Sequence, residues 1–170
     1  LTQKALIEGG RLLSLHAYSL LDAAEHGTDP AEREHADTLV SFLTPISKAC
    51  QTEWSIENTY NAMQCFGGHG YIHEYGMEQY ARDARITTIY EGTTGIQALD
   101  LIGRKTAASQ GAGLKLFLGM VEAFAKQHEG DPALAEFIAP LRAKAAEWGK
   151  LTIETLQRAA SNPDELGAAS

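Results

Sequence analysis

The chain has 170 residues, of which 44% are hydrophobic, and a formal net charge of -8. This length is enough for one domain and part of a second, and the composition suffices for a buried core. An acidic chain with scattered lysines and arginines offers no basic surface for nucleic acid or an anionic membrane. No apolar run approaches the roughly 20 residues that span a bilayer, and the first residues do not form a signal-peptide pattern. We therefore expect a folded intracellular protein without nucleic-acid partners.

The first predicted element is an amphipathic helix over residues 1–26, because apolar residues recur three and four positions apart. Gly27 can end this helix. Asp29, Pro30 and Glu32 then supply an N-cap, a first-turn proline and a capping-box acid for the next helix. The sequence predicts two antiparallel helices joined by this turn.

The second helix is predicted over residues 30–63, with a kink or a restart near Thr44, since Pro45 cannot donate to the helical ladder. Trp54 and Tyr60 occur at helical spacing and are expected in the core. Cys50 and Cys65 are expected to be reduced, packed thiols, because two cysteines make neither a disulfide scaffold nor a paired metal motif.

The stretch CFGGHGYIHEYG holds four glycines in twelve residues and predicts a loop. It lacks the Lys-Ser/Thr that closes a Walker loop, and it fails G-x-G-x-x-G because His73 stands where the third glycine belongs, so a plain tight turn is favoured. A ligand-binding turn stays open, since backbone N–H groups can bind a pyrophosphate and Gln64 precedes the loop by one turn. His69 and His73 could suggest zinc, but the glycines disfavour the helix that would align them, and no metal site is expected.

The remaining elements are also predicted to be helical. A short helix is expected over residues 76–85, an irregular segment after it, and another helix over residues 94–108. A linker at 109–113 precedes amphipathic helices over 114–126 and 132–160, the second of which includes Phe137 and Trp148 as expected core residues. The sequence NPDE from residue 162 has the pattern of a helix start, which suggests that the chain is part of a longer protein. The expected fold class is all-α, an up-and-down helical bundle.

Glu91 is the candidate for chemistry, in the stretch TTIYEGTTGIQ over residues 87–97. Most glutamates are solvated surface charges, and spacing alone favours that interpretation. However, Gly92 permits a sharp turn, and Ile89 and Tyr90 could shield the carboxylate from water. A shielded carboxylate is a better proton acceptor near neutral pH.

The sequence from residue 64 to residue 97, QCFGGHGYIHEYGMEQYARDARITTIYEGTTGIQ, resembles the C-terminal signature of the acyl-CoA dehydrogenases. Their pattern is Q-x-x-G-G-x-G-[YF], then R-D-[AS]-[KR]-I, then I-Y-E-G-T-x-x-I-Q, and the match is ungapped. The resemblance implies a C-terminal helical bundle domain over residues 1–108. Residues 109–170 resemble the start of an additional, truncated helical region found in a long, mostly bacterial branch.

The resemblance also implies a reaction, in which an acyl-CoA thioester loses its α-proton to a glutamate and its β-hydrogen as hydride to FAD, giving a trans-2-enoyl-CoA. Glu91 matches the catalytic base, and its backbone N–H would help to hold the thioester carbonyl. Arg82 and Asp83 match a family position for which an ion pair is expected. The implied substrate-binding residues are Tyr90, Glu91 and Gly92. The implied cofactor-binding residues are Gln64, Cys65, Phe66, Gly67 and Gly68, toward the FAD of a neighbouring subunit, and Thr93, Thr94 and Gly95, toward the FAD of their own.

Further implied partners are an acyl-CoA substrate, an electron-transfer flavoprotein or similar acceptor, and further copies of the chain in a dimer or tetramer. The implied location is the cytoplasm of a bacterium, or the mitochondrial matrix in a eukaryote. The chain alone is expected neither to hold FAD tightly nor to be active, because most of the flavin site would lie upstream. Two alternatives are a helical oligomerisation module without catalysis and an acyl-CoA oxidase.

Overall fold

The computed structural model describes residues 1–168, which form helices and turns and contain no strand. The expected all-α class is therefore confirmed. Contacts within the chain divide it into two compact units, unit 1 over Leu1–Ala98 and unit 2 from Leu99 onward. The predicted domain boundary between residues 108 and 109 stays a prediction. Within the described residues, no helix is both long and apolar enough to cross a membrane.

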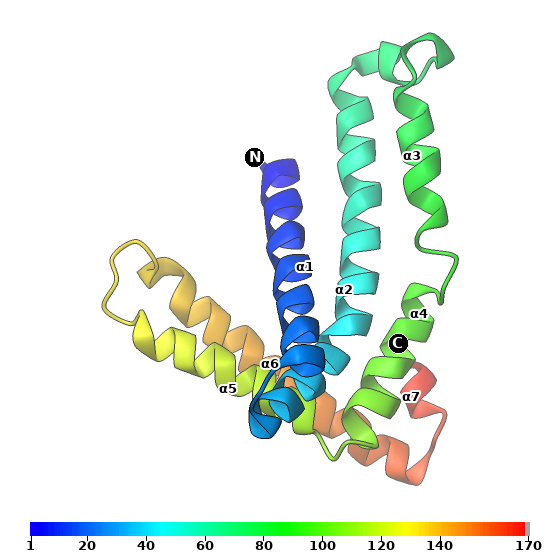
Figure 1. Ribbon diagram of the computed structural model, residues 1–170. Helices are drawn as coiled ribbons and strands as arrows, with labels where there is room; N and C mark the ends of the chain where they lie inside the picture. Colours follow the sequence, from blue (N-terminus) through cyan, green and yellow to red (C-terminus); the bar gives the residue numbers. More distant parts are fainter. Residues whose placement is uncertain (169–170) are drawn as a thin grey trace. The chain divides into compact units, whose positions relative to one another are not determined.

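Unit 1 is built on three helices that run alternately up and down, α1 (Thr2–His26), α2 (Pro30–Cys65) and α3 (Met77–Ile86) (Figure 1). The turn between α1 and α2 forms as predicted. Gly27 is the C-cap of α1, and Asp29 Oδ1 accepts a hydrogen bond from the Ala31 N–H at 3.0 Å to cap α2. A short helix, α4 (Thr94–Leu99), closes the unit.

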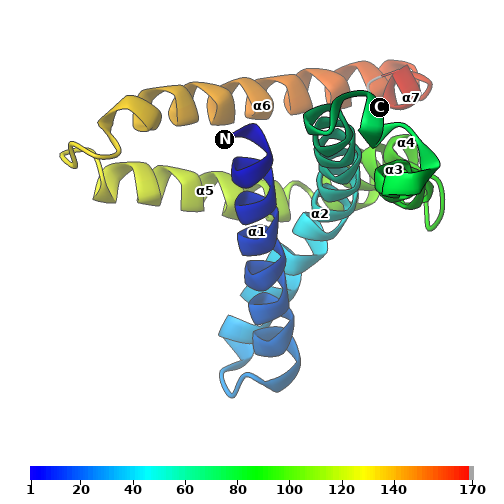
Figure 2. The same ribbon diagram turned by 90° about the horizontal axis from the view of Figure 1, so that it is seen from above.

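The longest helix, α2, continues through Pro45, so of the kink or restart predicted near Thr44 the restart is not found and a change of direction is (Figure 2). Its first part, drawn light blue, runs across the view in Figure 2, whereas the cyan to teal remainder is seen nearly end-on. This change of direction has two local causes. Pro45 lacks an N–H for the ladder, and the Thr44 hydroxyl donates to the Val40 carbonyl at 2.8 Å.

The core of unit 1 lies along α2. Alanines three residues apart on α3, Ala81 and Ala84, are buried and allow that helix to approach α2 closely. Two expected core aromatics behave differently, since Trp54 is half-buried near Gly10 but Tyr60 is 56% exposed. The most deeply buried side chains of α2 are Ala36, Leu39, Phe42, Leu43 and Pro45.

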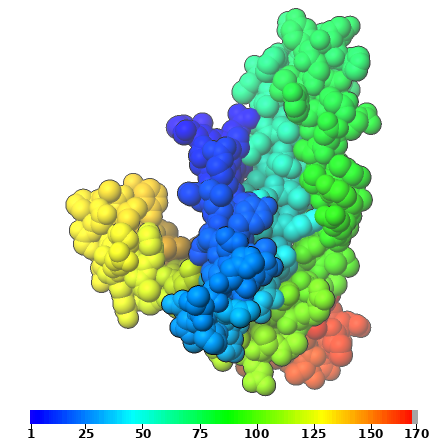
Figure 3. Space-filling view, in the orientation of Figure 1, coloured from blue at the N-terminus to red at the C-terminus, as the bar shows by residue number. Residues whose placement is uncertain are grey.

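The glycine-rich loop joins α2 to α3 as two 3-10 turns, η1 (Gly67–Gly70) and η2 (His73–Tyr75). It forms the upper end of unit 1 in Figures 1 and 3. Gly70 is buried against the end of α2, where a Cβ would lie only 2.2 Å from the Met63 carbonyl oxygen. Cys65 is exposed here and Cys50 is half-buried, so the expectation of a packed thiol is wrong for Cys65. Burial raises the pKa of the Cys50 thiol.

Unit 2 begins with a π-helix, η3 (Asp100–Ala107), where an uninterrupted continuation of the helix over 94–108 was predicted. The Thr106 hydroxyl donates to the Leu101 carbonyl five residues earlier, at 2.7 Å, in keeping with the wider turn. A turn with positive φ at Gln110 and Gly111 leads into α5 (Ala112–Gln127). Two further helices follow, α6 (Ala135–Ser161) and the four-residue α7 (Glu165–Ala168), which starts in the predicted NPDE segment.

The helices α5 and α6 pack against each other as a hairpin. The Phe117 and Trp148 rings meet edge to face with centroids 5.3 Å apart. Phe137, an expected core residue, is 57% exposed instead. Arg142 on α6 donates two hydrogen bonds of 3.1 Å to the Glu122 carboxylate on α5 and one of 3.0 Å to Glu129. These bonds lower the pKa of Glu122 and raise that of Arg142.

Replacing Gly70 with alanine should lower the free energy of unfolding by about 1–3 kcal/mol, because the new Cβ would overlap the Met63 carbonyl and force the loop away from α2. Urea denaturation measures the change. Gly68→Ala is the matched control, since a Cβ at that position meets nothing within 4 Å. Equal losses in both variants would contradict the proposed close contact.

Replacing Arg142 with methionine should lower the melting temperature at neutral pH by no more than about 5 °C, because the paired groups are partly solvated. The folded-state pKa of Glu122 lies below its ordinary value of 4.5. The ion pair therefore stabilises the protein fully above that value and loses its effect as pH falls through the lowered pKa. The difference between wild type and variant should accordingly shrink as the pH falls below 4.5.

Thermal melting at several pH values tests this dependence. Lys144→Met removes a single exposed pair with Glu147 and should have a smaller effect than Arg142→Met. A difference for Arg142→Met that is the same at acid and neutral pH would show that the ion pairs are not its cause.

Candidate functional site

Glu91 lies in a tight turn between α3 and α4. After α3, the chain makes further turns in which the Tyr90 N–H donates to the Ile86 carbonyl at 3.2 Å. Glu91 then has a φ of 55° and Gly92 a φ of 89°. A left-handed backbone is natural for glycine but uncommon for a glutamate. The turn is therefore a conformation that its surroundings must hold in place.

Three side chains hold this turn from outside it. Lys48 Nζ, on α2, donates a hydrogen bond to the Gly92 carbonyl oxygen. Gln97 Nε2, on α4, donates to the Glu91 carbonyl oxygen at 3.2 Å. The Thr94 hydroxyl donates to Glu53 Oε1, again on α2, at 2.8 Å. The segment from Glu91 to Thr94 is thus fastened to both neighbouring helices.

The space around Gly92 also favours glycine. A Cβ built there would lie 2.7 Å from Gln97 Nε2 and 3.3 Å from Ile96 Cγ2. The same amide that bonds the Glu91 carbonyl therefore occupies the volume that any larger residue would need. Both the positive φ and this contact explain why glycine follows Glu91.

The shielding expected for Glu91 is not found in this chain. Ile89 and Tyr90 are each about half exposed, and Glu91 itself is exposed. The reason is the direction of the turn, because Ala84 and Thr88 are buried whereas the three residues after Thr88 face outward. The interpretation that neighbouring apolar residues bury the carboxylate is wrong, and within the described residues the carboxylate is open to solvent.

Arg82 and Asp83 do not form the expected ion pair. Adjacent residues of a helix point in different directions. Asp83 accepts a hydrogen bond from Gln79 Nε2 at 2.7 Å, and within residues 1–168 Arg82 has no salt bridge. Arg82 instead lines a surface cavity of about 680 Å³ between α2 and α3, together with Tyr60 and Arg85.

The predicted cofactor-binding residues at the glycine loop form an exposed surface. Gln64, Cys65, Phe66, Gly67 and Gly68 are all exposed, and a Cβ on either glycine would meet nothing within 4 Å. A ligand could therefore approach the backbone closely at both glycines. The amide of Gln64 and the backbone groups of the loop suit the polar part of a flavin nucleotide. They form one open wall, so they fit such a group only as a contribution to a larger site.

The other predicted cofactor-binding residues lie at the start of α4. The Thr93 carbonyl accepts from the Gln97 N–H at 3.0 Å, and the Thr93 hydroxyl accepts from the Ile96 N–H at 3.4 Å. The Thr94 hydroxyl gives its hydrogen to Glu53, so it can serve a ligand only as an acceptor. Gly95 is exposed with open space around it.

The two sets of predicted cofactor residues are far apart along α2. Thr94 is hydrogen-bonded to Glu53 on α2. Gln64, the first residue of the glycine-loop set, follows Glu53 by eleven residues on the same helix, which corresponds to about 16 Å along the helix axis. The structure brings together Tyr90, Glu91, Gly92 and the Thr93–Gly95 segment, but not the glycine loop. The two sets therefore suit two different ligands, or two distant parts of one large ligand.

The histidines of the loop have other partners. The His69 ring lies against Tyr75 with centroids 4.9 Å apart, and His73 Nδ1 lies 2.8 Å from Glu78 Oε1. The hydrogen bond with His73 lowers the pKa of Glu78.

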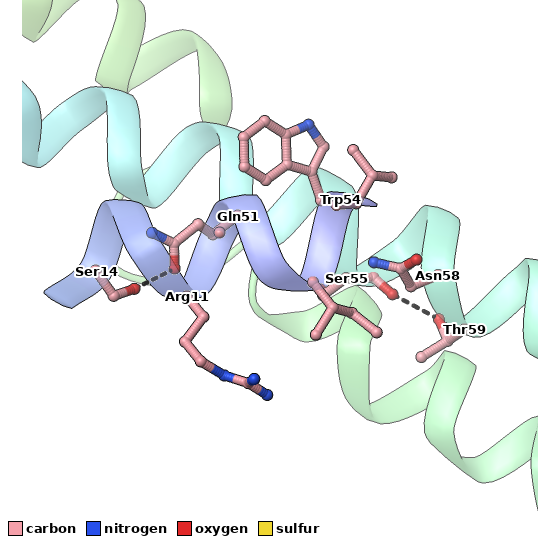
Figure 4. Close-up of a pocket in the computed structure, with 10 residues that line it drawn as sticks. Arg11, Ser14, Gln51, Trp54, Ser55, Asn58 and Thr59 are labelled. Atoms are coloured by element: carbon pink, nitrogen blue, oxygen red, sulfur yellow. Dashed lines mark hydrogen bonds between the residues drawn. The ribbon is translucent and has the colours of Figure 1, made fainter. Parts of the chain in front are cut away.

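A separate cavity of about 370 Å³ lies between α1 and α2 (Figure 4). The Ser14 hydroxyl donates to Gln51 Oε1 at 3.0 Å and the Thr59 hydroxyl to the Ser55 carbonyl at 2.9 Å. Its one charged lining residue, Arg11, is paired with Glu8 at 3.0 Å. With neither a carboxylate nor a nucleophilic thiol in its lining, this cavity offers less chemistry than the Glu91 turn.

Sequence reasoning missed Lys48 and Glu53 and gave Gln97 no role. No local pattern in the sequence marks these three residues, and the half-burial of Lys48 between Ser47 and Ala49 is visible only in the structure. Contacts between residues 44 positions apart leave no trace in local periodicity.

Known proteins match the part of the chain that contains the Glu91 turn. The family model described as "Acyl-CoA dehydrogenase, C-terminal domain" matches residues 2–106. A 3-methylmercaptopropionyl-CoA dehydrogenase from Ruegeria pomeroyi is 42% identical over 85% of the chain and 24% of its own length. A butyryl-CoA dehydrogenase from Syntrophomonas wolfei is 33% identical over 96% of the chain and 27% of its own length.

A broad-specificity linear acyl-CoA dehydrogenase from Mycobacterium tuberculosis is 35% identical over 79% of the chain and 22% of its own length. The chain thus spans about a quarter of the length of the curated relatives it matches. The family match covers more than half of the chain, including the glycine loop and the Glu91 turn. The chain belongs to the acyl-CoA dehydrogenase family, of which it carries the C-terminal domain.

Proposed function

We propose that the chain works as the C-terminal part of an FAD-dependent acyl-CoA dehydrogenase, in which Glu91 abstracts the α-proton of an acyl-CoA thioester. The observation that carries this proposal is the Glu91–Gly92 turn, a carboxylate in a left-handed conformation that three side chains hold in place. Uncommon backbone conformations that neighbours maintain are concentrated at functional sites. The named activities of the relatives support this reaction class.

The proposed reaction removes two hydrogens from the substrate. The α-proton passes to the Glu91 carboxylate, and the β-hydrogen leaves with its electron pair, so that a trans double bond forms between the two carbons. The acceptor for that hydride would be supplied by bound FAD. The Glu91 backbone N–H would donate to the thioester carbonyl and stabilise the negative charge that develops as the α-proton leaves. Tyr90 and Gly92, on either side of the base, would then contact the substrate.

The residues of this chain would contribute to the flavin site at two places. Thr93, Thr94 and Gly95 adjoin the base and would contact the cofactor that serves it. Gln64 to Gly68 lie about 16 Å away along α2 and would contact the cofactor of a neighbouring subunit. This division is supported by the open surface over Gly67 and Gly68. It would require at least two copies of the chain in the active enzyme.

The exposure of Glu91 is consistent with a site that other parts complete. Proton transfer from a weakly acidic carbon benefits from the exclusion of water. In the proposed enzyme, the substrate's acyl chain and the remaining domains would cover the half-exposed Ile89 and Tyr90.

In the full-length protein, replacing Glu91 with glutamine should reduce acyl-CoA-dependent flavin reduction by about 100-fold or more, since an amide cannot accept the α-proton. The flavin content should stay unchanged, because the side chain keeps its size. Anaerobic mixing with an acyl-CoA, followed by the flavin absorbance, measures the rate.

Glu57→Gln, which alters an exposed glutamate on α2, is the matched control and should reduce flavin at the wild-type rate. Full turnover by Glu91→Gln would refute the assignment of the base and favour an oligomerisation module. Hydrogen peroxide formation under air by the wild-type protein would instead favour an oxidase.

A further inference from the structure

We infer that Lys48 and Gln97 are positioning residues, which hold the Glu91–Gly92 turn in the geometry that its carboxylate needs for proton transfer. The inference rests on the proposed role of Glu91 and extends it, because neither side chain belongs to the set that the sequence assigns to substrate or cofactor. It follows from contacts that the structure records on the two peptide carbonyls after Tyr90.

The turn needs such support because its two residues have weak preferences for the conformation they adopt. Glu91 is in the left-handed region at φ 55°, where an L side chain crowds its own backbone. Gly92, at φ 89°, has no side chain to restrict it and could turn in many directions. Both residues lie outside regular secondary structure, so no helical hydrogen bonds fix them.

Lys48 and Gln97 supply the missing constraint on consecutive peptides. Gln97 Nε2 fixes the direction of the Glu91 carbonyl, and Lys48 Nζ fixes that of the Gly92 carbonyl. When the carbonyls of consecutive peptides are fixed, the backbone rotations at Gly92 between them are fixed as well. The Glu91 carbonyl carbon is bonded to the same Cα that carries the side chain, so a fixed carbonyl limits the directions that the Cα–Cβ bond, and with it the carboxylate, can take.

Lys48 is anchored better than an ordinary surface lysine. It is half-buried, and it follows Pro45, one of the most deeply buried residues of α2, by three positions. Among the described residues it has no salt bridge, so its ammonium group does not serve an ion pair. A hydrogen bond from a charged donor is stronger than one between neutral groups. The long Lys48 side chain, which starts from a packed helix, is therefore well suited to reach the Glu91–Gly92 turn and hold it.

The test replaces Lys48 with methionine in the full-length protein, which keeps the length of the stem and removes the donor. The kcat for acyl-CoA-dependent flavin reduction should fall by about 10- to 100-fold. A Glu91 carboxylate that is displaced from its place beside the substrate's α-hydrogen is poorly aligned for proton abstraction. KM should stay within about threefold, since the change affects the transition state more than substrate binding.

The isotope effect with α-deuterated substrate provides a readout that general destabilisation would not change. It should rise in Lys48→Met, because proton abstraction becomes more fully rate-limiting. Lys48→Arg, which keeps a charged donor, should recover most of the lost kcat. Lys4→Met, which removes an exposed lysine of α1, is the matched control and should leave both kcat and the isotope effect unchanged.

Flavin content and melting temperature show whether each variant is folded. Should Lys48→Met fail to retain flavin, Gln97→Met tests the same inference, with the same fall in kcat and rise in isotope effect. A folded variant at either position with wild-type kcat and isotope effect would overturn the inference.

The Glu91→Gln variant separates this inference from the proposed function. If Glu91→Gln loses activity while folded Lys48→Met and Gln97→Met keep theirs, the base assignment stands and the positioning role falls. If Glu91→Gln keeps full turnover, both fail.

Discussion

The left-handed backbone at Glu91 and Gly92 is the constraint on which the site depends. A chain leaving α3 would not hold this conformation by itself, and the molecule uses two helices to keep it. Lys48 and Glu53 reach it from α2, and Gln97 reaches it from α4. The packing of α1 and α3 against α2 matters because it holds α2 in place behind these contacts.

The sequence predicted most of the fold because the determinants of helices are local. Periodic apolar residues gave α1 almost to the residue, and Asp29 and Pro30 marked the start of α2. The behaviour at Pro45 was less predictable, since a proline can either end a helix or bend it and the outcome depends on packing. Pro45 is buried in the core, and α2 continues through it with a change of direction.

The site was predictable only in part. Spacing alone favoured a surface charge at Glu91, and it was the match of the whole stretch from residue 64 to residue 97 to a family signature that singled out this residue and its neighbouring glycines. The contact from Lys48 to Gly92 joins residues 44 positions apart, and nothing local in the sequence indicates it. Shielding of Glu91 was wrongly predicted from Ile89 and Tyr90, because hydrophobic composition does not reveal which way a turn faces. Under the proposed function, water would be excluded by groups outside this segment.

The spacing between the two ends of α2 has a consequence for how this helix can vary. Lys48 and Glu53, which contact the segment around Glu91, lie on the same helix that ends at the glycine loop, and Gln64 follows Glu53 by eleven positions. Each residue of an α-helix turns the chain by about 100° and advances it by about 1.5 Å. Loss or gain of one residue in this interval would aim the loop at a different side of the helix. Substitutions there can be accommodated, but a change in length would break the alignment between the two surfaces.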